Sequence, residues 1–293
     1  NLFLNGQKNN LENFTMKLTY YHGKNFGDGI NPLIFHKILP DFFDNDESIL
    51  FLGIGSILGL EKGNENTKKI IVFSSGYGAG NKEIYGEEPD LDDKYDVYCV
   101  RGPLTAKYFN LPDNKAVIDG AVLITNVIPA KNNTPKKFKY SFIPHHVSEN
   151  MYDNWKKICS KAGIHYISPA SDIEKVINEI NDSEIVLTEA MHGAILADVY
   201  RIPWIPLVFY SHINEFKWKD WLLSVNLKYN PNYLPSLFNS EHIQNLLEEK
   251  IPIIKNIPLL KSLLTLLYEI YQTHIIEKRV IKKINTFKTQ RGN

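Results

Sequence analysis

One histidine stands at the head of an otherwise apolar segment in TEAMHGAILADVY, residues 188–200. Histidine is the side chain best suited to moving protons at neutral pH, so His192 is a candidate for that task, although a lone histidine in such company is more often a structural core residue. The flanking runs SEIVLT (183–188) and IPWIPLVF (202–209) are typical of strands. His192 is therefore predicted just beyond a strand end, at the start of a crossover helix, where ligands bind in open α/β sheets.

Three glycine-rich turns follow other predicted strands: GKNFGDG (23–29), GIGS (53–56) and SSGYGAG (74–80). Backbone N–H groups in such turns can approach an anion closely, and a following helix adds its positive end. The turns supply the candidate substrate-binding residues Asn25, Gly27, Gly55, Ser56, Ser75 and Gly76, with Asp28 beside a helix start. Neither GxGxxG nor GxxxxGK[ST] occurs, so the signatures of dinucleotide and P-loop sites are absent from the sequence.

Arg101 ends an apolar strand pattern in VRGPLTAKYF, residues 100–109. Gly102 permits a sharp turn and Pro103 suits the first position of a helix. A guanidinium held there could bind phosphate or carboxylate through two parallel hydrogen bonds. Alternatively it pairs with a nearby carboxylate such as Asp119, and spacing alone does not decide between the two.

The second half of the chain adds a histidine pair in SFIPHHV, residues 141–147. Neighbouring side chains point in different directions, so at most one of His145 and His146 needs to face a ligand. Carboxylate or thiolate ligands at a regular spacing do not accompany them, and no metal is predicted. Glu189, at a strand end, and Gly193, which would leave room beside the ring of His192, complete the candidate substrate-binding residues.

These residues need two sets of strands to position them. The first set is KLTYYH, SILFLG, KKIIVFS, DVYCV and KAVID, and the second is FKYSFI, IHYIS, EIVLT and WIPLVF. Because helical patterns separate the strands, the sequence predicts an α/β fold of two parallel-sheet domains facing a cleft. The predicted divisions are a non-native or disordered lead (1–15), an N-terminal domain (16–130), a linker (131–137), a C-terminal domain (138–240) and a helical basic tail (241–293).

Composition narrows the choice of partners and compartment. The 33 basic and 33 acidic residues cancel, so no overall field attracts nucleic acid or a membrane. Two cysteines without a paired spacing favour a reducing compartment, and no run approaches the ~20 apolar residues of a membrane span. The lead has no apolar signal-peptide core, so a cytoplasmic protein is predicted.

The tail is the local exception to this neutrality. Six cations face one acidic residue, Glu277, over residues 274–293: Lys278, Arg279, Lys282, Lys283, Lys288 and Arg291. A solvated terminal helix explains this pattern, and attraction to the anionic inner face of a membrane is the sharper alternative.

The ordered motifs NFGDGINP, GIGSIL, VRGPLTA, IPHH, TEAMHGAILAD and FKWKDW together resemble the polysaccharide pyruvyl transferase family over residues 17–221. The resemblance implies two Rossmann-like halves similar to GT-B glycosyltransferases, and transfer of pyruvate from phosphoenolpyruvate onto a sugar as a ketal, without a cofactor. Two positions depart from the family pattern. Ala190 stands where many members carry arginine, and IDGAVLI (118–124) replaces a GDPALL-like run, which leaves Asp119 without a clear role.

By resemblance and position, His192 is the expected general acid or base and Asp28 acts on a sugar hydroxyl. Arg101 with Gly55 and Ser56 is the expected cradle for phosphate and carboxylate, and His145 or His146 adds a donor. The acceptor is expected to be a sugar or lipid-linked oligosaccharide.

Two other functions fit parts of the sequence. A nucleotide-sugar glycosyltransferase of the same build would use Glu189 on a ribose. A non-catalytic sugar-binding protein would explain aromatic residues such as Trp204, Trp218 and Trp221, but not the placement of Arg101 and His192.

Overall fold

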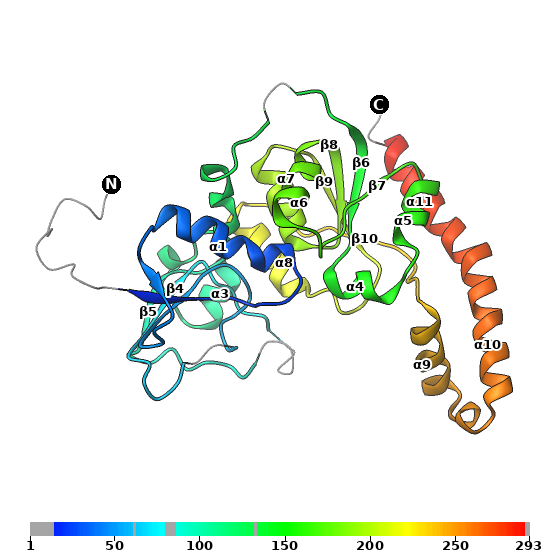
Figure 1. The fold of residues 1–293 in the computed structure, drawn as a ribbon, viewed down its shortest axis with the longest axis horizontal. Helices are drawn as coiled ribbons and strands as arrows, with labels where there is room; N and C mark the ends of the chain where they lie inside the picture. Colours follow the sequence, from blue (N-terminus) through cyan, green and yellow to red (C-terminus); the bar gives the residue numbers. More distant parts are fainter. Residues whose placement is uncertain (1–14, 61–62, 80–85, 132–133, 291–293) are drawn as a thin grey trace, which may run out of the picture. The chain divides into compact units, whose positions relative to one another are not determined.

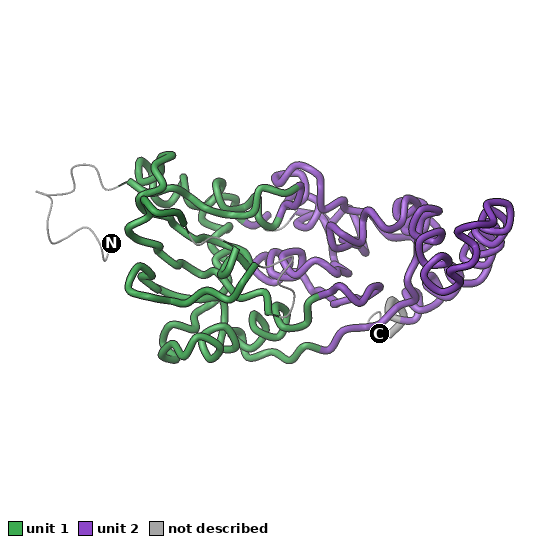
Figure 2. The backbone as a smooth tube through the Cα atoms, turned by 90° about the horizontal axis from the view of Figure 1, so that it is seen from below, with its two compact units in different colours: residues 1–23, 27–129, 214–229 green, residues 24–26, 130–213, 230–293 purple. Residues whose placement is uncertain are grey.

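The computed structural model describes residues 15–60, 63–79, 86–131 and 134–290. The chain divides into two compact units (Figure 2). Unit 1 comprises residues 1–23, 27–129 and 214–229, and unit 2 comprises residues 24–26, 130–213 and 230–293. This differs from the predicted division, because residues 214–229 belong with the first unit rather than the second. The predicted lead lies outside the described residues except for Thr15.

Unit 1 contains a five-stranded parallel sheet in the order β2-β1-β3-β4-β5. Its strands are β1 (Met16–Thr19), β2 (Phe43–Asp44), β3 (Ile49–Leu52), β4 (Lys69–Phe73) and β5 (Tyr95–Cys99). Its helices are α1 (Phe26–Ile38), α3 (Pro103–Tyr108), α8 (Glu215–Ser224) and the 3₁₀ helices η1 (Asp113–Lys115) and η2 (Gly120–Asn126). The run ILFL of β3 is apolar throughout because a parallel sheet is covered on both faces.

The predicted strand KAVID is not a strand in the structure. Ala116 forms only an isolated bridge with Val100, and the 3₁₀ helix η2 follows. Asp119 begins that helix: its buried carboxylate accepts a hydrogen bond from the backbone N–H of Ala121 at 3.0 Å. The residue that had no clear role in the sequence is therefore a helix cap.

Unit 2 contains the second five-stranded parallel sheet, in the order β10-β9-β8-β6-β7. Its strands are β6 (Phe138–Ile143), β7 (His165–Tyr166), β8 (Ser183–Thr188), β9 (Trp204–Val208) and β10 (Asn232–Tyr233). The helices between them are α4 (His146–Met151), α5 (Trp155–Lys161), α6 (Ile173–Asn181) and α7 (Met191–Val199). Two parallel sheets with intervening helices confirm the predicted α/β fold of two Rossmann-like units.

The predicted tail is helical and forms part of unit 2 (Figure 1). Its elements are α9 (Ser240–Lys250), η3 (Pro252–Asn256), α10 (Pro258–Tyr271), the π-helical turn η4 (Gln272–Ile276) and α11 (Glu277–Gln290). Ile276, Val280 and Ile284 are buried in the same apolar cluster as Trp155 and Phe209. The tail therefore contributes side chains to the core of unit 2. Among the described helices, none has the length and apolar character to cross a bilayer.

Candidate functional site

Arg101, two residues after the end of β5, is completely buried in unit 1. Its Nε donates to Asp220 Oδ2 at 3.0 Å, Nη1 donates to Ser56 Oγ at 2.6 Å, and Nη2 donates to the carbonyl of Tyr77 at 2.9 Å. The guanidinium thereby ties α8 to the turns that follow β3 and β4. Gly76 must lack a side chain, because a Cβ there would overlap the guanidinium carbon.

This environment corrects the expectation that Arg101 lies open to a ligand. The structure contains the alternative arrangement, a pairing with an aspartate, but the partner is Asp220 in α8 rather than Asp119. Asp220 is itself buried and also accepts hydrogen bonds from the Thr105 hydroxyl (2.6 Å) and the Leu104 N–H (2.8 Å). The guanidinium is therefore not exposed to a phosphate in this arrangement.

The glycine- and serine-rich turns after β3 and β4 are joined to each other. Ser75 Oγ donates to the Gly53 carbonyl, and the Gly76 N–H donates to the Gly55 carbonyl at 2.9 Å. Ser75 and Gly76 are buried, so the structure assigns them to joining the turns rather than to an exposed cradle. Gly55 has a φ of +132°, a conformation that favours glycine.

Asp28 lies in the first turn of α1, half-buried, close to the turn after β3. Its Oδ1 would be 3.1 Å from a Cβ on Gly55, so the absence of a side chain at Gly55 gives this carboxylate its space. The neighbouring candidates differ in exposure: Asn25 is half-buried and Gly27 is buried.

Asn31 fixes the position of this part of α1, and the sequence reasoning missed it. It is fully buried; its Nδ2 donates to the carbonyls of Ile54 (2.9 Å) and Asp28 (2.8 Å), and its Oδ1 accepts from the Ile54 N–H at 2.7 Å. A Cβ on Gly53 would overlap Asn31 Oδ1. The Asn-Pro pair inside NFGDGINP was the available signal, because asparagine in a helix needs such a partner.

In unit 2, Glu189 follows β8 and is completely buried. Its Oε1 accepts the Phe209 N–H at 2.6 Å and its Oε2 accepts the His145 N–H at 3.4 Å. The carboxylate thus connects the residues that follow β6, β8 and β9. Burial raises the pKa of Glu189 to about 7, against the smaller lowering effect of these hydrogen bonds.

A group of histidines adjoins Glu189. The rings of His145 and His146 lie 4.3 Å apart and those of His145 and His212 lie 5.4 Å apart, between centroids. His212 Nε2 lies 3.1 Å from Ser148 Oγ, and that hydroxyl also hydrogen-bonds Glu189. Burial, with a contribution from His146, lowers the pKa of His212 to about 4, so this ring is neutral at pH 7.

The histidine pair differs from its predicted geometry, since the two rings are neighbours instead of pointing apart. His145 is the N-cap of α4, where its Nδ1 accepts the Val147 N–H at 3.3 Å. That nitrogen is therefore unprotonated, and any proton on the ring of His145 is on Nε2.

His192 lies in the first turn of α7, as predicted, and is 9% exposed. Gly193 has a structural explanation that differs from the prediction. A Cβ there would be 2.6 Å from Thr188 Oγ1 and 3.1 Å from Ile143 Cδ1, so glycine lets α7 pack closely on β8 and β6.

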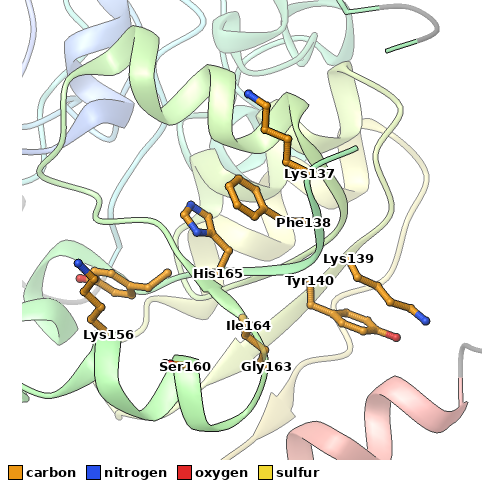
Figure 3. Close-up of a pocket in the computed structure, with 10 residues that line it drawn as sticks. Lys137, Phe138, Lys139, Tyr140, Lys156, Ser160, Gly163, Ile164 and His165 are labelled. Atoms are coloured by element: carbon orange, nitrogen blue, oxygen red, sulfur yellow. The ribbon is translucent and has the colours of Figure 1, made fainter. Parts of the chain in front are cut away.

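The hollow shown in Figure 3 is separate from these residues. It measures about 480 Å³, and its lining includes Lys137, the first three residues of β6 (138–140), Lys156 and His165. The rings of Phe138 and His165 stack there with 3.6 Å between centroids. None of the predicted site residues lines this hollow, and we assign it no part in the site. Among the described residues, no group of three or more His, Cys, Asp or Glu side chains is arranged to hold a metal ion.

Comparison with known proteins shows which family this chain belongs to. The model of the family described as polysaccharide pyruvyl transferase matches residues 7–209. The chain belongs to this family. It is 36% identical, over 216 residues, to "Succinoglycan biosynthesis protein ExoV" of Rhizobium meliloti (strain 1021); the match covers 73% of this chain and 65% of that relative. A crystal structure of a functionally uncharacterised protein from Klebsiella pneumoniae subsp. pneumoniae NTUH-K2044 aligns with 69% of this chain and 85% of its own, at 19% identity and a TM-score of 0.45.

The matched family segment contains every predicted site residue, but two residues found only in the structure lie beyond it. Asp220, which holds Arg101, and His212, which is linked to Glu189 through Ser148, both follow residue 209. Asp220 occurs in FKWKDW, so that motif carried a signal for a buried partner that charge spacing could not reveal.

Proposed function

We propose that this chain transfers a pyruvyl group from phosphoenolpyruvate onto two hydroxyls of one sugar in a polysaccharide or its precursor, forming a pyruvate ketal. The observation that carries the proposal is the family match over residues 7–209, which contains Asp28 and His192. Further support comes from the positions of these two residues, each in the first turn of a helix that follows a parallel strand.

The proposed reaction needs proton transfer and no redox step. A proton adds to the methylene carbon of phosphoenolpyruvate, and one sugar hydroxyl forms a bond to the adjacent carbon. The carbon–oxygen bond to phosphate then breaks, and a second hydroxyl forms the second ketal bond. The sugar gives up two protons, of which one balances the new methyl group and the other leaves with phosphate.

We assign His192 to proton transfer at the methylene carbon and Asp28 to accepting a proton from a sugar hydroxyl. An imidazole suits this task at neutral pH, and such catalysis contributes roughly 10²–10⁴ in rate. Asn25 and Gly27 adjoin Asp28 in the sequence and are proposed to contact substrate, with His145 or His146 as a further donor.

For the anionic groups of the donor, we propose the turn that contains Gly55 and Ser56. Arg101 is assigned a positioning role, because its hydrogen bond to Ser56 and its contact with Gly76 hold this turn in place.

We further propose that the acceptor is a sugar or lipid-linked oligosaccharide, met at the cytoplasmic face of a membrane through the basic tail. The printed name of the relative from Rhizobium meliloti, a succinoglycan biosynthesis protein, supports an acceptor of this class.

The structure weakens both alternatives. Glu189 is buried with both oxygens bonded to backbone N–H groups, so it is not placed to bind the ribose of a nucleotide sugar. Trp218 and Trp221 are 2% and 1% exposed and so form core instead of a surface for sugar stacking.

Phosphate release from phosphoenolpyruvate, measured with a panel of acceptor glycosides, tests the proposal. We expect release that depends on one acceptor, with a ketal detected in the product by NMR. Calorimetry with phosphoenolpyruvate, UDP, GDP and CMP is the companion measurement. Micromolar binding of a nucleotide, with neither phosphoenolpyruvate binding nor phosphate release, would establish the glycosyltransferase instead.

A further inference from the structure

The outer side of α10 is apolar along its whole length. Within Pro258–Tyr271, all of which the structure describes, the exposed large apolar side chains are Leu259, Leu263, Leu266, Leu267, Ile270 and Tyr271, which we call the α10 face. They are exposed by 84, 50, 52, 52, 47 and 45%, respectively. The other exposed residues of this helix are Pro258 and Ser262, so none of its exposed side chains is charged.

The charged residues of α10 are directed elsewhere. Lys261 forms an ion pair with Glu248 of α9, with 2.5 Å between Nζ and Oε1, and Ser240 donates a hydrogen bond to Glu269. These contacts hold the polar side of α10 against α9. The α10 face, on the other side of the helix, stays exposed and is not covered by any described residue.

The same side of the helix becomes basic in α11. Thr265 of α10 and Val280 of α11 are 5% and 1% exposed and mark the buried side. A separation of two residues turns an α-helix by about 200°, so Leu263, Leu267, Lys278 and Lys282 point away from that side. Arg279 is exposed beside Lys278, and we call Lys278, Arg279 and Lys282 the α11 cations.

Within the described part of the chain, no acidic side chain forms an ion pair with these cations. Glu277, the acidic residue of α11, is buried, accepts a hydrogen bond from the Tyr152 hydroxyl at 2.6 Å and pairs with Lys161 at 3.2 Å. Lys283, by contrast, donates to the Tyr233 carbonyl. The exposed surface of α10 and α11 therefore has an apolar end and a cationic end.

We propose that the α10 face inserts into the surface of an anionic lipid bilayer, with the α11 cations on the lipid headgroups. At a rise of 1.5 Å per residue, α10 is only about 21 Å long, shorter than the ~30 Å hydrocarbon core, so it would lie in the plane of the interface. This deepens the membrane contact proposed above by assigning the apolar contribution to α10. It does not depend on which reaction the chain catalyses.

A lipid surface fits these residues better than a second copy of the chain. Two copies packed in parallel along α10 and α11 would bring both sets of α11 cations together. An antiparallel pairing over the same length would place the cations of one copy against the leucines of the other, at a cost in desolvation. In a bilayer surface, the hydrocarbon would cover the α10 face while the neighbouring anionic headgroups would neutralise the α11 cations.

Sedimentation of the full chain with phosphatidylglycerol-containing vesicles, and with pure phosphatidylcholine vesicles, tests the inference. We expect binding to the anionic vesicles that falls on the order of a hundredfold when the α11 cations are replaced by glutamine, since each cation near the surface is worth about a factor of five. The double variant Leu263→Glu/Leu267→Glu should abolish binding. Leu227→Glu, at a leucine outside this surface that is 43% exposed, is the matched control.

A label on the α10 face distinguishes insertion from simple electrostatic attraction. Leu267→Cys can be labelled with a polarity-sensitive fluorophore because Cys99 and Cys159 are both buried. A blue shift with anionic vesicles, absent from labelled Leu227→Cys, supports insertion. Equal signals from the two sites, or vesicle binding that survives Leu263→Glu/Leu267→Glu, would overturn it. A dimer dissociated by that double variant, without vesicle binding, would identify a second copy as the occupant.

These outcomes are independent of the proposed reaction. Phosphate release with a soluble acceptor should be unchanged in the α10 variants, so loss of vesicle binding and loss of activity report on separate proposals. A thermal melt of each variant checks that unit 2 remains folded.

Discussion

Arg101 and Asp220 are 119 residues apart in the sequence and form a completely buried ion pair, with 3.0 Å between Nε and Oδ2. Each partner has further hydrogen bonds, Arg101 to Ser56 and Asp220 to Thr105. The pair therefore joins α8 to two turns at the carboxyl end of the first sheet. A buried charge without its partner is strongly destabilising, so this pair should matter more for folding than any surface pair.

The first prediction concerns this pair. Asp220→Asn should lower the free energy of unfolding by about 3–5 kcal/mol, because Arg101 would remain buried without a counter-charge. Urea unfolding monitored by fluorescence measures the loss. The matched control is Asp96→Asn, which breaks the exposed Lys69–Asp96 pair and should cost at most about 1 kcal/mol. Similar losses in the two variants would contradict the assigned role.

Asn31→Ala is the second prediction. It removes the partner of both the N–H and the carbonyl of Ile54, and leaving buried polar groups unpaired costs about 1–3 kcal/mol each. We expect a lower melting temperature and also a lower turnover, because Asp28 is carried on the same part of α1. Turnover that stays normal below the new melting temperature would show that Asn31 supports the fold alone.

The third prediction separates catalysis from packing at His192. His192→Ala should lower turnover by about 10² or more while changing the melting temperature little, because proton transfer is lost and α7 is retained. A rate assay and a thermal melt, run side by side, measure both effects. His36→Ala, at an exposed histidine of α1, should alter neither. A large fall in melting temperature for His192→Ala would indicate that His192 is a structural core residue and not a catalytic one.

The fourth prediction follows from the raised pKa of Glu189. Its folded value of about 7 exceeds the ordinary value of 4.5, so the fold favours the protonated form. The unfolded chain ionises first as the pH rises, so the contribution of Glu189 to stability should be greatest below pH 4.5 and decline between 4.5 and 7. This decline amounts to about 3 kcal/mol at 1.36 kcal/mol per pKa unit.

Glu189→Gln isolates that contribution, because an amide does not titrate and its oxygen can still accept the Phe209 N–H. Thermal melts of both proteins between pH 4 and 8 give the difference. We expect the wild type to lose stability relative to the variant as the pH rises toward 7. Parallel curves would mean that Glu189 titrates normally.

The local patterns of the sequence predicted the longer strands of both sheets, but not the two-residue strands β2 and β10, and the run KAVID is not a strand. The helical patterns between the strand runs predicted parallel sheets, and β3 and β8 do pair in parallel with their neighbours. The placement of His192 at the start of a helix after β8 was also predicted, since that position depends only on neighbouring residues.

Long-range partners were decided only by the tertiary structure. Sequence showed Arg101 at a strand end with a choice between a ligand and a nearby carboxylate, but it could not indicate Asp220, which α8 brings back to unit 1. The burial of Glu189 depends in the same way on three strand ends meeting. Charge and hydrogen-bonding capacity belong to each residue by itself, whereas solvent exclusion and the choice of partner arise only when distant segments pack together.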